Sequence, residues 1–264
     1  MMADVESGSA AAQASNRLDD VWEKLSSVVD PELDEPVTDM KFISSVDVDD
    51  EDVVHVGFRL PTYWCAANFA FMMAEDMRSA IKALPWVKEA RIVLADHMYA
   101  DKINAGISQG HSFAETFGSE ANGNLEEVRH TFLVKAYQRR QEALLQHLLK
   151  IGLPISYLAS MSMRELADIR LKSDGRTLVN RYIERRDVVG SFDNCSKAFL
   201  TADGQDIDPD TMIAYLGALR RVKANAEFNG ALCRGLLAVR FDMETPLSAR
   251  KPHRDASKAA SAEP

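Results

Sequence analysis

The segment from Val53 to Pro85 changes its hydrophobic period once, at Leu60-Pro61-Thr62-Tyr63-Trp64-Cys65. Before this loop every second residue is apolar, as in a half-buried strand: Val54, Val56, Phe58 and Leu60. After it, apolar residues recur every three or four positions until Pro85 stops the run. The pattern predicts a strand, a turn and a helix, with Cys65 at or just before the first helical turn.

Cys65 would therefore lie where a helix presents unpaired N–H groups and the positive end of its dipole. Such positions favour a thiolate, the form of cysteine that attacks electrophiles or binds metal. The alternative is a small apolar residue packed at a helix start, because free cysteine is among the most buried residue types.

The elements around this segment predict a small domain of pattern αββαβ over residues 16–97. A helix capped by Ser15 or Asn16 would end at Pro31, and a strand would start near Met40. The acidic run 47–52 suits a solvated hairpin turn, and residues 87–94 suit a third strand. A strand–helix–strand order in one sheet implies a parallel crossover connection. Asp30 and Glu32 would lie on the turn between helix and strand.

Residues 98–124 are rich in glycine and show no sustained period, so we expect a linker or long loop. His97 directly precedes this segment and His111 lies within it. Both are candidate metal ligands, and Asp96 and Asp101 lie near them in sequence. Their spacing matches no rigid metal motif, and solvated histidines are the alternative.

The rest of the chain is helical in pattern, predicting an all-helical domain over residues 125–244 and an α+β protein overall. Asp208-Pro209 predicts a helix start, and Cys233 lies in an apolar stretch that suggests packing. Arginine pairs occur at 139–140, 185–186 and 220–221. They suit solvated helix faces. Alternatively they form a basic surface that receives an acidic partner or the protein's own acidic first domain. Residues 1–15 and 245–264 read as disordered tails.

Composition excludes several classes of function. Residues 1–101 hold 20 acidic and 8 basic side chains, which argues against nucleic-acid binding. No apolar run is long enough to span a membrane, and residues 1–15 lack the pattern of a signal peptide. Three scattered cysteines predict neither a disulfide framework nor a zinc finger. We expect a cytoplasmic protein with free thiols.

Three short motifs carry a resemblance to a family. They are Asp30-Pro31-Glu32 followed by Pro36-Val37, the stretch Pro61-Thr62-Tyr63-Trp64-Cys65, and Leu84-Pro85-Trp86-Val87 before the last strand. Their order resembles the SufT/PaaD-like metal–sulfur (iron–sulfur) cluster assembly domain family over residues 17–96. Family members commonly have glycine before the cysteine and proline after it, where this chain has Trp64 and Ala66.

The resemblance implies an accessory maturation factor, not an enzyme, that assists iron–sulfur cluster or iron-centre assembly in a client metalloenzyme. It implies Cys65 as the metal or cluster contact, with Asp30, Glu32, Pro61 and Thr62 as the supporting motif. An iron-dependent oxygenase is a client class that PaaD-like relatives suggest. One thiolate cannot hold a cluster that needs four ligands, so the cargo would be transient. A second subunit in a homo-oligomer, glutathione or the recipient would complete the shell.

Two other functions remain open. The chain could be a metal-free scaffold or chaperone for a metalloenzyme, a role that Trp64 beside Cys65 would suit. It could also be an enzyme that uses Cys65 as a nucleophile, with His55 as the nearest candidate base in sequence.

Overall fold

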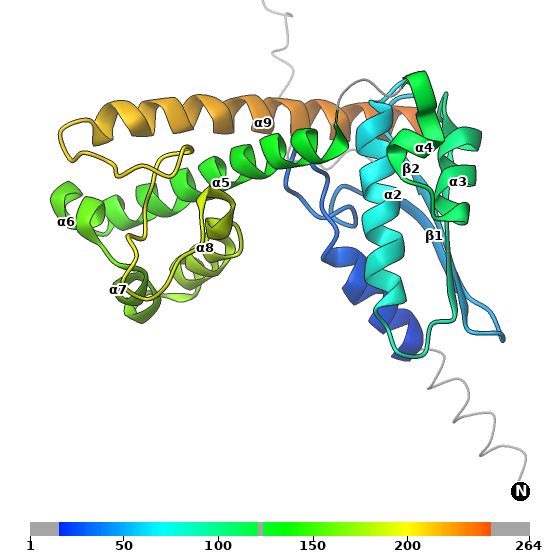
Figure 1. The fold of residues 1–264 in the computed structure, drawn as a ribbon, viewed down its shortest axis with the longest axis horizontal. Coiled ribbons are helices and arrows are strands. Elements are labelled where there is room, and N and C mark those ends of the chain that lie inside the picture. The colour runs from blue at the N-terminus through cyan, green and yellow to red at the C-terminus, as the bar shows by residue number, and fades with distance from the viewer. Residues whose placement is uncertain (1–15, 121–123, 244–264) are drawn as a thin grey trace, which may run out of the picture.

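The computed structural model describes residues 16–120 and 124–243. The two predicted tails, 1–15 and 245–264, lie outside the described residues, as does Ser15. The chain forms an α/β unit, residues 16–120, followed by a helical unit, residues 124–243 (Figure 1). The expected fold class, a small α+β arrangement followed by helices, is confirmed.

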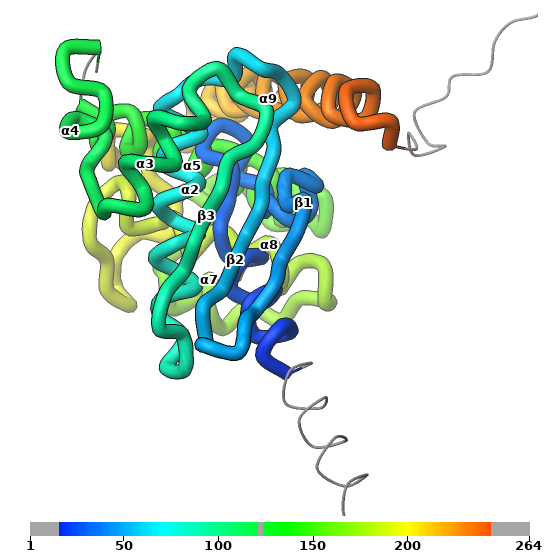
Figure 2. Tube along the Cα trace, turned by 90° about the vertical axis from the view of Figure 1, so that its right-hand side faces the viewer, coloured from blue at the N-terminus to red at the C-terminus, as the bar shows by residue number. Residues whose placement is uncertain are grey.

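A three-stranded sheet is the centre of the α/β unit (Figure 2). Strands β1 (Ile43–Val48) and β2 (Val53–Arg59) form an antiparallel hairpin, and β3 (Glu89–Ala95) pairs in parallel with β2. In β3 buried and exposed residues alternate strictly, so only one face of this strand is covered. The predicted order αββαβ and the parallel crossover are both confirmed.

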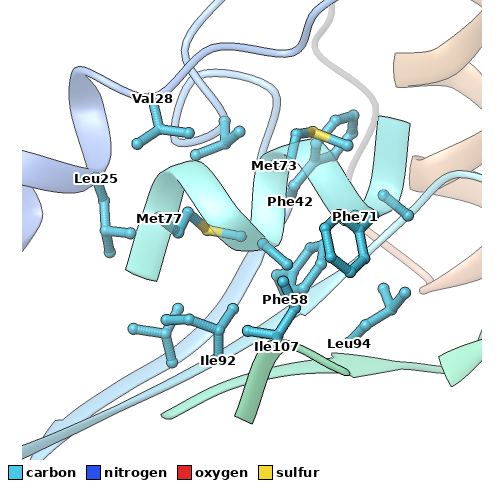
Figure 3. Close-up of a cluster of buried hydrophobic side chains, with 14 of the residues drawn as sticks. Leu25, Val28, Phe42, Phe58, Phe71, Met73, Met77, Ile92, Leu94 and Ile107 are labelled. Carbon is cyan, nitrogen blue, oxygen red and sulfur yellow. The ribbon is translucent and has the colours of Figure 1, made fainter. Parts of the chain in front are cut away.

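The first core lies between the sheet and the helices on its covered face (Figure 3). Helix α2 (Ala67–Lys82) buries Phe71, Met73 and Met77 against the apolar side chains of β2 and β3. Residues 16–26 form the first helix, which contributes Leu25 to this core. Val28, just after the helix, also packs in it. Removal of these side chains from water supplies the main favourable free energy of folding for this unit.

The expected linker over residues 98–124 was wrong. This segment holds α3 (Ala100–Gln109), α4 (Phe113–Phe117) and the short η1 (Gly118–Glu120). Two of its glycines, which as a pattern favour a loop, belong to α3 and its C-terminal end. Gly106 lies inside α3, where a Cβ would collide with Thr116, and Gly110 ends α3 in the left-handed conformation at φ 73°.

The helical unit has its own core. It comprises α5 (Leu125–Lys150), α6 (Ile155–Ser160), α7 (Met163–Asp168), α8 (Ser173–Ile183), η2 (Arg186–Val189) and α9 (Met212–Arg240). Tyr137, Leu144 and Tyr182 are among its fully buried side chains. The predicted start at Asp208-Pro209 is a turn, and α9 begins three residues later, after Thr211.

Helix α9 belongs to both units. It runs beside α5 and then crosses to the end of the sheet (Figure 1). Met212, Leu216 and Leu219 pack in the second core, whereas Leu237 is buried in the first. The two hydrophobic cores are thus joined by one continuous helix.

The acidic turn, residues 30–35, is the polar link between the units. Arg140 of α5 binds Asp34 with two bonds, Nε to Oδ2 at 2.6 Å and Nη2 to Oδ1 at 2.8 Å. Arg185 adds a contact to Asp34 Oδ1 at 3.3 Å. The exposed fractions are only 5% for the Asp34 side chain and 8% for that of Arg140, so this ion pair is buried.

Arg139, Arg140 and Arg185 thus meet the protein's own acidic first unit, one of the expected roles. Arg186 is instead buried in the helical unit and donates to the carbonyls of Ala198, Gly190 and Lys197. Arg139 also donates to the Glu32 carbonyl at 2.7 Å. Beside these contacts an open cleft of about 960 Å³ separates the units, lined largely by charged side chains.

Replacement of Arg140 by alanine should lower the free energy of unfolding by roughly 3–5 kcal/mol, because it leaves the Asp34 carboxylate buried without its partner. The matched control is Lys197→Ala, which breaks the exposed Lys197–Asp206 pair and should cost no more than about 1 kcal/mol. Urea denaturation of both variants measures the difference. Equal losses would show that the buried pair does not hold the units together.

Candidate functional site

The cysteine loop, residues 60–66, connects β2 to α2. Pro61 is buried at its start, and the Thr62 hydroxyl lies 3.1 Å from the Cys65 sulfur, within hydrogen-bond distance. The Met98 N–H donates to the Tyr63 carbonyl at 2.8 Å. The loop is therefore fixed from within and by the segment after β3, while Cys65 itself stays half-buried.

His97 holds the loop from the other side. Its Nδ1 accepts from the Tyr99 N–H at 3.1 Å, so its Nε2 carries the proton and donates to the Cys65 carbonyl at 2.8 Å. Both ring nitrogens are thereby engaged in this buried residue. The contacts give His97 a positioning role toward Cys65, whereas its role as a metal ligand stays a prediction.

Cys65 directly precedes the N-cap of α2, as expected. The N-cap is Ala66, whose side chain cannot accept a hydrogen bond, and the first turn of α2 contains no acidic residue. The unpaired N–H groups at this helix end favour negative charge beside them. A thiolate or a thiolate-bound cargo would supply that charge.

Asp30 organises the acidic turn. Its Oδ1 accepts from the Leu33 N–H at 2.8 Å, and its backbone pairs with Asp34 and Glu35. Burial raises the pKa of the Asp30 carboxyl to about 6, against the lowering effect of the Leu33 hydrogen bond. Glu32 on the same turn accepts from Asn229 of α9 at 2.9 Å. Asp30 thus shapes the turn, and Glu32 contacts the helical unit.

Sequence reasoning missed the position of Cys233. The expected packing is confirmed, because Cys233 is half-buried on the first core. Yet its helix face also lies over the candidate site, because Asn229, one turn earlier, contacts Glu32. Burial raises the pKa of the Cys233 thiol to about 11, and the nearby Asp30, Cys65 and Glu32 add to the rise. The available signal was the four-residue spacing of Asn229, Cys233 and Leu237, which places them on one helix face.

The other candidate ligands lie apart from this arrangement. His111 is exposed, just beyond Gly110 at the end of α3. Across residues 16–120 and 124–243, no group of three or more His, Cys, Asp or Glu side chains could hold a metal ion. A four-coordinate metal at Cys65 would therefore take at least two of its ligands from outside the described part of the chain.

His55, the candidate base for a catalytic cysteine, points elsewhere. Its Nε2 lies 3.1 Å from Asp49 Oδ2, at the hairpin turn. His97 contacts the Cys65 carbonyl rather than the sulfur. These contacts give a cysteine–histidine catalytic pair no support.

Comparison with known proteins identifies the family of the α/β unit. A family described as iron–sulfur cluster assembly protein matches residues 18–92. An uncharacterised protein of Methanocaldococcus jannaschii is 35% identical over 88 residues, which are 33% of this chain and 88% of that protein. The chain belongs to this iron–sulfur cluster assembly family through its α/β unit. No solved structure matches it.

The family match ends before α3 and the helical unit. Among the described residues, no helix is both long and apolar enough to span a membrane.

The buried carboxyl of Asp30 predicts a pH-dependent stability. Its pKa rises from 3.8 to about 6 on folding, so the folded chain binds more protons than the unfolded chain between these values. The stabilisation from protonated Asp30 is complete at low pH and is lost as the pH rises through about 6.

Asp30→Asn cannot titrate but keeps an oxygen for the Leu33 N–H. The free energy of unfolding of wild type relative to Asp30→Asn should therefore fall by roughly 2 kcal/mol between about pH 4 and pH 7. Urea denaturation at several pH values measures it. A difference that does not change with pH would mean that Asp30 is not held in an apolar site.

Proposed function

We propose that this protein is an accessory maturation factor that assists assembly or delivery of an iron–sulfur cluster or iron centre to a partner metalloenzyme. Family membership indicates a role in cluster assembly. The observation that supports the finer proposal is the position of Cys65, half-buried, fixed by Thr62 and His97, and set against the N-terminal end of α2. Soft thiolates are the protein ligands that iron–sulfur clusters use.

The cargo would be held transiently. A cluster normally takes four protein ligands, mostly cysteine. The described residues offer no cluster of ligands that could hold a metal ion without outside help. A recipient protein that supplied the missing ligands would both complete the coordination and draw the cargo away. This exchange suits delivery better than permanent storage.

Exposed aromatic side chains beside Cys65 support a partner surface. The exposed fraction is 72% for Trp64 and 49% for Tyr63, although both are large and apolar. Exposed apolar groups of this kind commonly mark protein interaction sites. Helix α9 adds further exposed apolar residues, namely Ile213, Phe228, Leu232, Leu236 and Val239. We propose that the client, such as an iron-dependent oxygenase, contacts the cysteine loop and is recognised through the helical unit.

A metal-free scaffold is the second candidate, and the exposure of Trp64 is the observation that favours it. In this case the domain would keep its fold and its partner surface without handling iron. Maturation of the client would then survive Cys65→Ser, whereas the leading proposal requires its loss.

Iron loading of the cysteine site tests the leading proposal. Wild-type protein, Cys65→Ser and Cys195→Ser are reconstituted with iron and sulfide under anaerobic conditions. Iron content, acid-labile sulfide and the visible absorption spectrum are then measured. We expect wild type and Cys195→Ser to bind iron equally and Cys65→Ser to lose most of it, because the exposed Cys195 lies on the helical unit.

Cys195→Ser is the control for general thiol chemistry. Iron bound equally by all three proteins would show non-specific binding. If none of them binds iron, the cluster-carrier proposal fails and the scaffold becomes the better account.

A further inference from the structure

One face of α9 covers the candidate site. Asn229, Cys233 and Leu237 are each four residues apart and so lie on the same side of the helix. Asn229 donates to Glu32 of the acidic turn at 2.9 Å, and Leu237 is buried in the first core. Cys233 lies between these two contacts, so its side chain faces the α/β unit rather than solvent.

The C-terminal end of α9 is tied to the cysteine loop itself. Arg240 donates to the Leu60 carbonyl at 3.0 Å, where the loop begins. It also donates to the Asp96 carbonyl at 2.7 Å and forms an ion pair with the Asp96 carboxylate. Asp96 directly precedes His97, the residue that holds Cys65. Contacts before and after Cys233 therefore fix its helix over the acidic turn and the cysteine loop (Figure 1).

The face of α9 that carries Cys233 thus lies over the acidic turn and the start of the loop that carries Cys65. Both cysteines are half-buried, and both pack on the first core. Burial raises the pKa of the Cys233 thiol, and the nearby Asp30, Cys65 and Glu32 add to the rise, which agrees with this placement of α9. Cys195, in contrast, is exposed and belongs to the helical unit.

We propose that Cys65 and Cys233 form a two-thiol site for a thiophilic metal ion at the junction of the cysteine loop and α9. The inference rests on the proposed function and adds a second ligand to it. Each thiol loses its proton to solvent as its sulfur binds the metal, with no change in oxidation state. Two thiolates would hold one iron of the cargo and leave its other coordination positions to the recipient.

Cobalt(II) is a suitable probe, because thiolate ligands give the bound ion intense charge-transfer absorption. The ion is added to the reduced full-length protein under anaerobic conditions. Wild type is compared with Cys65→Ser, Cys233→Ser and the control Cys195→Ser. We expect the absorption per bound cobalt to fall to about half in each of the first two variants, since one of two thiolates is lost. Cys195→Ser should match wild type.

Cys233→Ala is measured alongside, because a hydroxyl at this half-buried position could disturb packing. Its urea midpoint shows whether the fold is kept. Full cobalt absorption in Cys233→Ser and Cys233→Ala, with a loss in Cys65→Ser, would overturn the two-thiol site and leave the single contact at Cys65 standing. An unchanged spectrum in the Cys65 variant as well would contradict both the two-thiol site and the proposed function.

Discussion

The buried ion pair between Asp34 and Arg140 fixes how the helical unit sits on the α/β unit. A buried carboxylate needs a partner of opposite charge, and Arg140 supplies it with two bonds. Asp34 can reach this partner because the Asp30 side chain and backbone shape the acidic turn. A motif that resembles the family's acidic turn therefore serves here as the anchor for an added unit.

The same turn also determines where α9 lies. Glu32 accepts from Asn229, and Glu35 pairs with Arg234 at 2.7 Å. These contacts, together with Leu237 in the first core, hold α9 across the acidic turn. The helical unit therefore contributes to the candidate site, and we propose that it also recognises the client. In this proposal one helix, α9, would connect the candidate site to the client-binding surface.

Much of the α/β unit could be predicted because its elements have clear periods. The alternation from Val54 to Leu60 and the helical spacing after Cys65 each correspond to one element. The prediction of a linker over residues 98–124 was wrong because Gly106 allows α3 to pack on α4 and Gly110 ends α3. Local composition does not distinguish such glycines from those of a loop. Cys233 was missed for a different reason. The acidic turn and the cysteine loop are distant from it in sequence, and only the tertiary contacts of Asn229 and Arg240 place its helix over them.

Chemical cross-linking of the two cysteines tests the central claim most directly, namely that α9 places Cys233 beside Cys65. The Cys195→Ser variant leaves these two as the remaining thiols. It is treated under reducing-agent-free anaerobic conditions with a short bifunctional maleimide, then digested and mapped by mass spectrometry. The account predicts one intramolecular cross-link that joins the peptides of Cys65 and Cys233, and its loss after urea denaturation. Single-ended adducts alone on both cysteines of the folded protein would contradict it.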